Sequence, residues 1–299
     1  MGGGICYNNS RPAINKMKIA VTGTTGFVGR HVLAELFTKP IDVVAHVRKI
    51  ENKLELPLCK KVNFDLYDKS KNAFAELLRP DALIHLAWSG LPNYKSNHHL
   101  DEELEYQYEF LEGLVKSGLQ TMVIAGTCFE YGMQSGQLNE DILPQPNNSY
   151  SIAKDVLRVK LESLKKQKNF NLIWARIFYL YGEGQSRSSI YSQLITAVEE
   201  GKDFFNMSKG EQLRDYLPVT VAAKYLVQLA LSNIDVGIVN VCSGVPISVL
   251  DLVEKWKEKN GWTIRLNLGY YDYPDYEPMH FWGDNRKLLS VLSELNINS

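Results

Sequence analysis

Two ionisable side chains, Tyr150 and Lys154, stand four residues apart in the segment YSIAK. In a helix this spacing puts both on one face, so a phenol and an ammonium can meet the same ligand. A free phenol titrates at about 10, and a neighbouring positive charge favours the phenolate, which eases proton exchange with a substrate oxygen. The pattern YxxxK is common by chance in helices. Its weight here comes from its place after a strand expected at Thr121–Ala125, with Thr127 just beyond as a second hydroxyl.

Short apolar strands that alternate with helices must position these residues. Strands are predicted at Lys18–Val21, Ile41–Val47, Ala82–Ala87, Thr121–Ala125 and Asn171–Arg176, and helices near Phe27–Leu36 and at Asn72–Leu78, Glu102–Lys116, Ser149–Lys168, Ser189–Glu200, Thr220–Ser232 and Val249–Asn260. This alternation is typical of an α/β protein with a doubly wound parallel sheet, the Rossmann arrangement. Such a sheet presents ligands at the carboxyl ends of its strands, where Thr127 and Tyr150 would meet.

The chain of 299 residues allows one large domain or two moderate ones. We expect residues 17–180 to form a dinucleotide-binding domain, with a return contribution near 214–243. Residues 181–299 are expected to form mainly a smaller mixed α/β substrate lobe, since helices there mix with Pro- and Tyr-rich loops. Residues 1–16 are expected to be a disordered tail, because Gly and Asn stand where a signal peptide needs an apolar core.

Three glycines follow the first strand at intervals of three: Gly23, Gly26 and Gly29 in TGTTGFVG. Glycines at a junction between strand and helix allow a tight turn and let backbone amides reach a pyrophosphate at the positive end of the helix. The alternative is a plain turn, because a lone glycine triplet is a weak signal. Its position after Thr22, at the first such junction, favours dinucleotide binding.

The tip of the second strand decides which dinucleotide is expected. That strand ends in AHVRK, with Arg48 and Lys49 and without an acidic residue. A carboxylate there would bind the ribose hydroxyls of NAD, whereas a guanidinium pairs with the 2′-phosphate of NADP. The sequence therefore favours NADP, with NAD still possible. The alternative for Arg48 is a solvated charge at a strand end.

Composition excludes several classes of function. A net charge of -1 gives no bulk attraction for a polyphosphate backbone, so nucleic acid is not an expected partner. No apolar run is long enough to span a membrane. The four cysteines are far apart and form no CxxC pair, which argues against a metal site and fits a reducing cytoplasm.

Several motifs together identify a family. They are TGTTGFVG, HLA at 85–87, GTCFEYG at 126–132, YSIAK at 150–154, ARIFYLYGEGQ at 175–185 and RDYLPVTVAA at 214–223. The chain resembles the extended short-chain dehydrogenase/reductases, in the branch of nucleotide-sugar epimerases, dehydratases and reductases. The resemblance runs from about Met17 to near the C-terminus.

The resemblance implies roles for individual residues. Tyr150 would be the acid/base, Lys154 would hold the nicotinamide ribose and lower the pKa of Tyr150, and Thr127 would bind the reacting oxygen. The cofactor would contact Gly23, Thr25, Gly26, Phe27, Val28, Gly29, Arg48, Asp65, Leu66, Ala87, Tyr150 and Lys154, with Asp65 at the adenine. The substrate would contact Trp88, Thr127, Cys128, Phe129, Tyr150 and Arg214, with Arg214 at the diphosphate. We also expect a homodimer.

Departures from the family pattern narrow the chemistry. The 4,6-dehydratases carry Thr-Asp-Glu where this chain has Thr127, Cys128 and Phe129, so the acid/base pair that eliminates water is missing. The GDP-fucose synthases carry a Cys two places after the hydroxyl residue and a His after the YG motif, and this chain has neither. Pro218 and Thr220 also differ from the usual residues, in the substrate lobe.

The remaining expectation is NADPH-dependent reduction of the 4-keto group of a 4-keto-6-deoxyhexose linked to dTDP, GDP, CDP or UDP. The product would be a deoxysugar donor for a cell-surface glycan such as an O-antigen. The first alternative is a 4-epimerase with a retained NAD, which the basic strand tip argues against. The second is a protein that only senses a dinucleotide, which the intact Thr127, Tyr150 and Lys154 argue against.

Other chemically able residues have more than one interpretation. Cys128 could be a nucleophile, but a small residue lining the pocket is favoured, and His85 inside an apolar strand is expected to be structural. His98 and His99 are expected to be solvated in a polar loop. Trp88 could line the pocket or pack in the core. The Tyr-rich segment 270–278 could be a surface loop or a flap over the substrate.

Overall fold

A seven-stranded parallel sheet forms the centre of the computed structural model, which describes residues 16–48, 58–273 and 277–297. Its strands are β1 (Lys18–Thr22), β2 (Asp42–His46), β3 (Lys60–Val62), β4 (Ala82–His85), β5 (Thr121–Thr127), β7 (Asn171–Ile177) and β11 (Gly237–Val241). They pair in the order β11-β7-β5-β4-β1-β2-β3. The order reverses between β1 and β4, and a doubly wound sheet binds its ligands at the strand ends beside such a switch point. The predicted Rossmann class is therefore confirmed.

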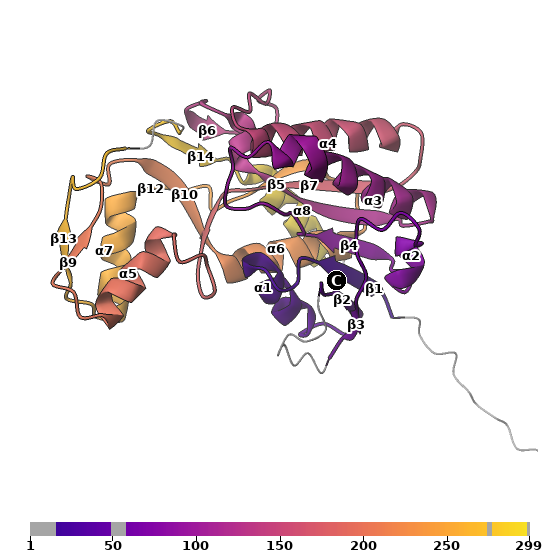
Figure 1. The fold of residues 1–299 in the computed structure, drawn as a ribbon, viewed down its shortest axis with the longest axis horizontal. Coiled ribbons are helices and arrows are strands. Elements are labelled where there is room, and N and C mark those ends of the chain that lie inside the picture. The colour runs from indigo at the N-terminus through magenta and orange to yellow at the C-terminus, as the bar shows by residue number, and fades with distance from the viewer. Residues whose placement is uncertain (1–15, 49–57, 274–276, 298–299) are drawn as a thin grey trace, which may run out of the picture.

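Helices cover both faces of this sheet (Figure 1). Helices α1 (Phe27–Leu36), α6 (Val219–Ser232) and α8 (Arg286–Ile297) lie on one face, and α2 (Ala73–Glu76), α3 (Leu104–Lys116) and α4 (Ser149–Lys165) on the other. Successive strand residues point to opposite faces, so Ile19 and Val21 belong to one apolar cluster and Ala20 to the other. Burial on both faces is why these strands are continuously apolar.

A smaller lobe extends from the sheet at the left of Figure 1. It contains the strands β8 (Tyr179–Tyr181), β9 (Phe204–Asn206), β10 (Leu213–Pro218), β12 (Pro246–Ser248) and β13 (Arg265–Asn267), and the helices α5 (Ile190–Glu199) and α7 (Val249–Asn260). These elements share an apolar cluster around Leu194, Phe205, Val253 and Trp256. The predicted mixed α/β lobe is present. A further strand pair, β6 (Gly136–Leu138) with β14 (Phe281–Gly283), lies near the start of α4.

The structure differs from the predicted elements at several places. The helix expected at Asn72–Leu78 is a single turn, because Leu78 and Arg79 adopt left-handed backbone conformations that end it. The helix expected from Glu102 begins earlier, as a π-helical turn at His99–Glu103. Helix α8 was not predicted, although its Leu288 and Leu292 are spaced for one buried helix face. The tail expected at 1–16 lies, except for Lys16, outside the described residues.

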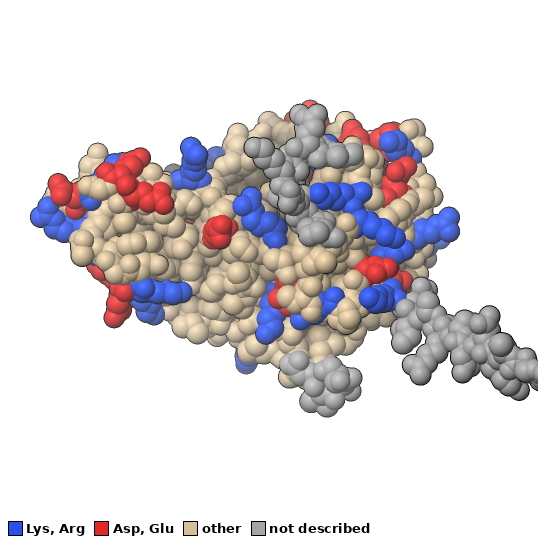
Figure 2. All heavy atoms as spheres, turned by 90° about the horizontal axis from the view of Figure 1, so that it is seen from below, with Lys and Arg blue, Asp and Glu red and all other residues tan. Residues whose placement is uncertain are grey.

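The surface carries acidic and basic side chains interspersed, around a largely uncharged area in the view of Figure 2. None of the helices in the described ranges combines the length and the apolar character that a bilayer crossing requires. Across the same ranges, His, Cys, Asp and Glu side chains form no group of three that could hold a metal ion.

Candidate active site

The glycine turn between β1 and α1 is built so that only glycine fits. The N–H of Gly26 donates to the carbonyl of Gly23 at 3.0 Å, and Gly23 has a φ of +72°. A Cβ on Gly23 would lie 2.7 Å from the backbone N of Ala87, and one on Gly29 would lie 2.1 Å from the Gly23 carbonyl oxygen. Both positions therefore pack against backbone and exclude a side chain, which keeps the turn tight at the start of α1, where a helix binds phosphate.

A hydrogen bond connects the end of β2 to this turn. The Thr24 hydroxyl donates to the carbonyl of His46 at 2.6 Å, and the ring Nε2 of His46 lies 2.8 Å from the carbonyl of Phe64. Burial lowers the pKa of His46, so the ring is a neutral structural group. Arg48 is exposed just beyond β2, while Lys49 lies outside the described residues. The predicted cofactor contact of Arg48 thus stays a prediction.

Two further residues predicted to contact the cofactor, Asp65 and Leu66, lie in the loop after β3. Asp65 accepts the backbone N–H of Tyr67 at 3.0 Å. Leu66 packs on the apolar cluster beneath α3 and lines a separate hollow of about 260 Å³, beside the stacked rings of Tyr67 and Tyr106. Neither Asp65 nor Leu66 is among the described residues that line the larger cleft at the glycine turn.

That cleft has a volume of about 560 Å³ and joins residues from distant parts of the chain. Its predicted residues are Gly23, Gly26, Phe27, Val28, Gly29, Trp88, Thr127, Cys128, Phe129, Tyr150 and Lys154. Sequence reasoning missed other residues that also line it, namely Leu86, Leu91, Tyr94, Ala125, Gly126, Ile177, Phe178, Tyr179, Leu180 and Gln185. Five of these ten stand in the motif ARIFYLYGEGQ, so the resemblance of that motif to the family could have indicated them.

Helix α4 carries Tyr150 and Lys154 into the cleft. Asn148 caps the start of this helix, because its side chain accepts the N–H of Ser151 at 3.0 Å. Tyr150 is 8% exposed and Lys154 is 2% exposed. The Lys154 Nζ donates to the carbonyl of Ala125 at 2.9 Å and lies 3.8 Å above the centre of the Trp88 ring.

Burial dominates the titration of both groups. It lowers the pKa of Lys154 to about 7, against the raising effect of the Glu130 and Glu103 carboxylates. It also raises the pKa of Tyr150, and the charge of Glu130 adds to that rise. The sequence led us to expect that Lys154 lowers the pKa of Tyr150. Burial raises the pKa of Tyr150 overall, and the Lys154 ammonium is directed at Ala125 and Trp88, so the effect of Lys154 on the pKa of Tyr150 stays a prediction.

Thr127 is the last residue of β5 and is also largely buried. Its hydroxyl oxygen accepts the N–H of Phe129 at 3.3 Å, and its own N–H donates to Glu130 at 2.9 Å. The contact from Phe129 uses a lone pair and leaves the hydroxyl hydrogen to serve another acceptor. Thr127 and Tyr150 line the same cleft.

A buried polar network supports the loop after β4. Glu103 accepts the N–H of Ser89 at 2.8 Å and its hydroxyl at 2.5 Å. The Trp88 Nε1 donates to His99 at 3.1 Å, which fixes one edge of the ring that faces Lys154. Both alternatives for Trp88 hold in part, because its side chain lines the cleft and also packs against the apolar cluster beneath α3.

The histidines differ from one another in this region. His85 is buried between Thr22 and Gln107, and burial lowers its pKa to about 3, as expected for a structural histidine. His99 was expected to be solvated, and this was wrong: it is buried and bonded to Trp88 and to the Asn93 carbonyl. His98 lies partly exposed at the Ser89 hydroxyl.

The smaller lobe holds Arg214 on β10. Its guanidinium donates to Glu277 at 2.9 Å and to the carbonyls of Leu213 and Met279 at 2.9 and 3.0 Å. Arg214 is thus engaged within the lobe, and its predicted contact with a diphosphate stays a prediction. Cys128 is buried, and burial raises the pKa of its thiol, which fits a lining residue better than a nucleophile.

Comparison with known proteins agrees with this geometry. The model of the NAD dependent epimerase/dehydratase family matches residues 19–242. The chain is 27% identical over 270 residues to dTDP-6-deoxy-L-talose 4-dehydrogenase (NAD(+)) of Aggregatibacter actinomycetemcomitans, covering 89% of this chain and 99% of that protein. It is 28% identical over 258 residues to GDP-6-deoxy-D-mannose reductase of Pseudomonas aeruginosa, covering 79% and 78%.

Solved structures show the same fold. MoeE5, determined in complex with UDP-glucose and NAD, superposes with a TM-score of 0.78 at 27% identity, covering 92% of each chain. The matched family model spans the glycine turn, Thr127, Tyr150 and Lys154, which are the residues that the cleft brings together. The chain therefore belongs to the NAD dependent epimerase/dehydratase family.

Proposed function

We propose that this protein reduces the 4-keto group of a nucleotide-linked 4-keto-6-deoxyhexose with NADPH, a reaction that is reversible in principle. The main support for this proposal is that the glycine turn, Thr127 and Tyr150 line one cleft. Two relatives support the substrate class, since their names describe a 4-dehydrogenase of a dTDP-6-deoxyhexose and a reductase of a GDP-6-deoxyhexose.

The residues present fit a dinucleotide. Gly23, Gly26 and Gly29 line the cleft, and the tight turn that they form brings the start of α1 to the place where a pyrophosphate would bind. The buried Lys154 offers donors inside the cleft, where ribose hydroxyls would be its partners. When bound, the reduced nicotinamide supplies a hydride.

Tyr150 and Thr127 supply the proton and the orientation. Burial keeps the Tyr150 phenol protonated, so it can give its proton to the sugar oxygen as the carbonyl carbon gains a hydride. The Thr127 hydroxyl donates to the same oxygen and stabilises the charge that develops on it. The product is an alcohol, and the phenolate left on Tyr150 must be reprotonated before the next turnover.

The side chains after Thr127 argue against a second reaction. Cys128 is a neutral thiol because burial raises its pKa, and Phe129 has no ionisable group. Neither residue is suited to take a proton from a sugar carbon, as dehydration or 3,5-epimerisation requires. A simple hydride and proton transfer is the chemistry that remains.

Arg48 supports the choice of NADPH. Its exposed side chain follows β2, the strand whose end lies beside the adenosine ribose in this fold. One relative is named as an NAD(+) enzyme and one neighbour was solved with NAD, so both cofactors belong in the test.

The test is an assay with dTDP-, GDP-, CDP- and UDP-linked 4-keto-6-deoxyhexoses, each with NADPH or NADH. We expect loss of the reduced-nicotinamide absorbance in step with formation of one alcohol product. Interconversion of 4-epimers without net change in the nicotinamide would instead establish a 4-epimerase, and the reductase would be rejected.

A further inference from the structure

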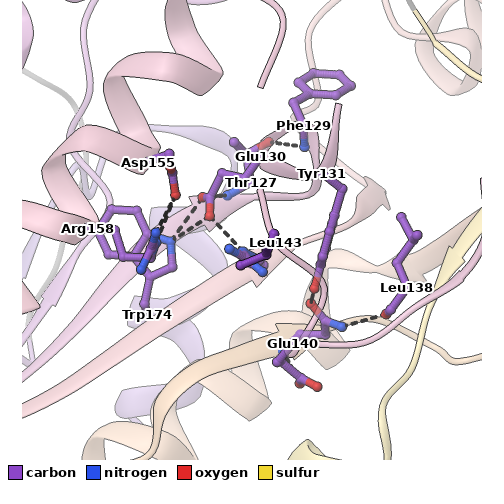
Figure 3. A network of polar contacts seen from close by, with 12 residues as sticks. Thr127, Phe129, Glu130, Tyr131, Leu138, Glu140, Leu143, Asp155, Arg158 and Trp174 are labelled. Atoms are coloured by element: carbon purple, nitrogen blue, oxygen red, sulfur yellow. Dashed lines mark hydrogen bonds and ion pairs between the residues drawn. The ribbon is translucent and has the colours of Figure 1, made fainter. Parts of the chain in front are cut away.

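A carboxylate is buried directly behind Thr127. Glu130 lies on the 3-10 turn Cys128–Tyr131 and is fully buried. It accepts the N–H of Thr127 at 2.9 Å, the Nε1 of Trp174 at 3.0 Å and the Nε of Arg176 at 2.7 Å. Figure 3 shows this carboxylate between Thr127 and Trp174.

Other residues are shaped to admit this carboxylate. A Cβ on Gly126 would lie 2.4 Å from the Trp174 Nε1 and 2.8 Å from the Glu130 Oε1, so the close approach requires glycine there. Arg176 is also fully buried, and its guanidinium lies over the Tyr131 ring at 4.6 Å. A buried ion pair is costly to desolvate and is weak support for stability alone.

The described residues that line the cleft do not include Glu130, so it touches the site only through its neighbours. It forms a capping box with Thr127: the Thr127 hydroxyl accepts the N–H of Phe129, and Glu130 accepts the N–H of Thr127. Capping boxes satisfy two donors reciprocally and fix the side-chain conformation of the first residue. Here the fixed group is a hydroxyl whose hydrogen is free for an acceptor in the cleft.

We propose that Glu130 is a positioning residue that sets the Thr127 hydroxyl as a hydrogen-bond donor toward the reacting oxygen. The inference rests on the proposed function, in which Thr127 donates to that oxygen. The acceptor that receives the Thr127 N–H is the essential feature, and the buried Arg176 keeps that acceptor in place. A misplacement of a reacting group by about 1 Å can cost on the order of 10²-fold in rate, so a small shift of Thr127 would matter.

Two double variants separate this role from a general effect on folding. E130Q/R176M keeps an oxygen acceptor for the Thr127 N–H, whereas E130M/R176M removes it, and neither leaves a buried unpaired charge. We expect the first to keep kcat within about threefold of the parent and the second to lose about 10- to 100-fold, with the Kd of the dinucleotide unchanged in both. If E130M/R176M is insoluble, E130N/R176M takes its place, because the shorter amide withdraws the acceptor.

Both double variants are then also made in a chain that carries Thr127→Val, a substitution that on its own should lower kcat by about 10²–10³-fold. If Glu130 acts through Thr127, the difference between the two variants should shrink there to less than about threefold. Equal kcat values for the two double variants, or a difference that persists without the hydroxyl, would overturn the inference. If Thr127→Val has parent activity, the role given to Thr127 is wrong and the inference fails with it. If the parent protein itself does not turn over the 4-keto sugars, the proposed function is at fault instead.

Crystal structures of both double variants give a readout that needs no substrate. The Thr127 hydroxyl should keep its contact with the Phe129 N–H in E130Q/R176M and lose it in E130M/R176M. An unchanged Thr127 side chain in both would also overturn the inference.

Discussion

Replacing Lys154 with Met should make the protein more stable and inactive. Lys154 is an ammonium buried beside Trp88 and Tyr150, and its Nζ bonds to the carbonyl of Ala125. The side chain of Met is unbranched, as that of Lys is, and it carries no charge to desolvate. We expect the cofactor and substrate cleft to keep its shape and lose its cation.

The magnitude follows from the pKa of Lys154, which falls from the ordinary 10.5 to about 7 in the folded chain. At about 1.4 kcal/mol per pH unit this corresponds to roughly 5 kcal/mol of lost stability. Because the unfolded chain holds the proton more tightly, stability rises with pH between the two values, and the full penalty applies below about 7. Loss of the hydrogen bond to the Ala125 carbonyl costs about 1 kcal/mol. Lys154→Met should therefore raise the free energy of unfolding by about 3–5 kcal/mol at about pH 6.

The assay is urea unfolding of the parent and of Lys154→Met across a range of pH. The gain should be largest below about pH 7 and should shrink as the pH approaches the ordinary value of 10.5. Lys160→Met on the same helix is the control: Lys160 is partly exposed and pairs with Glu105, so its change should stay within about 1 kcal/mol. A Lys154→Met protein that is less stable than the parent at low pH, or a gain in stability that does not depend on pH, would show that burial of the Lys154 charge does not destabilise the fold.

Three further outcomes are expected. Tyr150→Phe keeps the aromatic contacts with Trp88 and Tyr94 but loses the proton donor. The kcat should therefore fall by about 10²–10⁴-fold, with little change in the Kd of the dinucleotide. Near-normal turnover would remove Tyr150 from the mechanism. Arg48→Ala should weaken the binding of NADPH by about 10- to 150-fold and leave the binding of NADH nearly unchanged, as measured by titration. Equal weakening of both would show that Arg48 is only a charge at a strand end. Gly29→Ala places a Cβ 2.1 Å from the Gly23 carbonyl oxygen. It should lower the free energy of unfolding, measured in urea, by about 1–3 kcal/mol and weaken the binding of both dinucleotides. Parent-like stability and binding would contradict the packing of this turn.

Local patterns were sufficient to predict the centre of the fold and the main site residues. The strand at Lys18–Val21 and the glycines after it are adjacent in sequence, and Tyr150 and Lys154 share one helix face through their spacing alone. Thr127 could be placed because the end of a parallel strand is also a local feature.

Features that depend on tertiary packing could not be predicted in this way. Glu130 stands in the motif GTCFEYG, but its burial becomes visible only when β7 brings Trp174 and Arg176 against it. His99 was expected to be solvated because its neighbours are polar, whereas Trp88 and Asn93 enclose it in the fold. The titration of Lys154 likewise depends on the Trp88 ring, which lies in another segment of the chain.

The proposed reaction moves a hydride from the dinucleotide to C4 of the sugar while Tyr150 supplies the proton. This is tested by turnover with NADPH that carries deuterium at the transferable position, followed by mass spectrometry and NMR of the product. We expect one deuterium at C4 of the alcohol for each NADPH consumed, and no enzyme-dependent uptake of deuterium at C3 or C5 when the solvent is D₂O. A product without deuterium at C4, or deuterium from solvent at C3 or C5 above an enzyme-free control, would rule out direct reduction at C4.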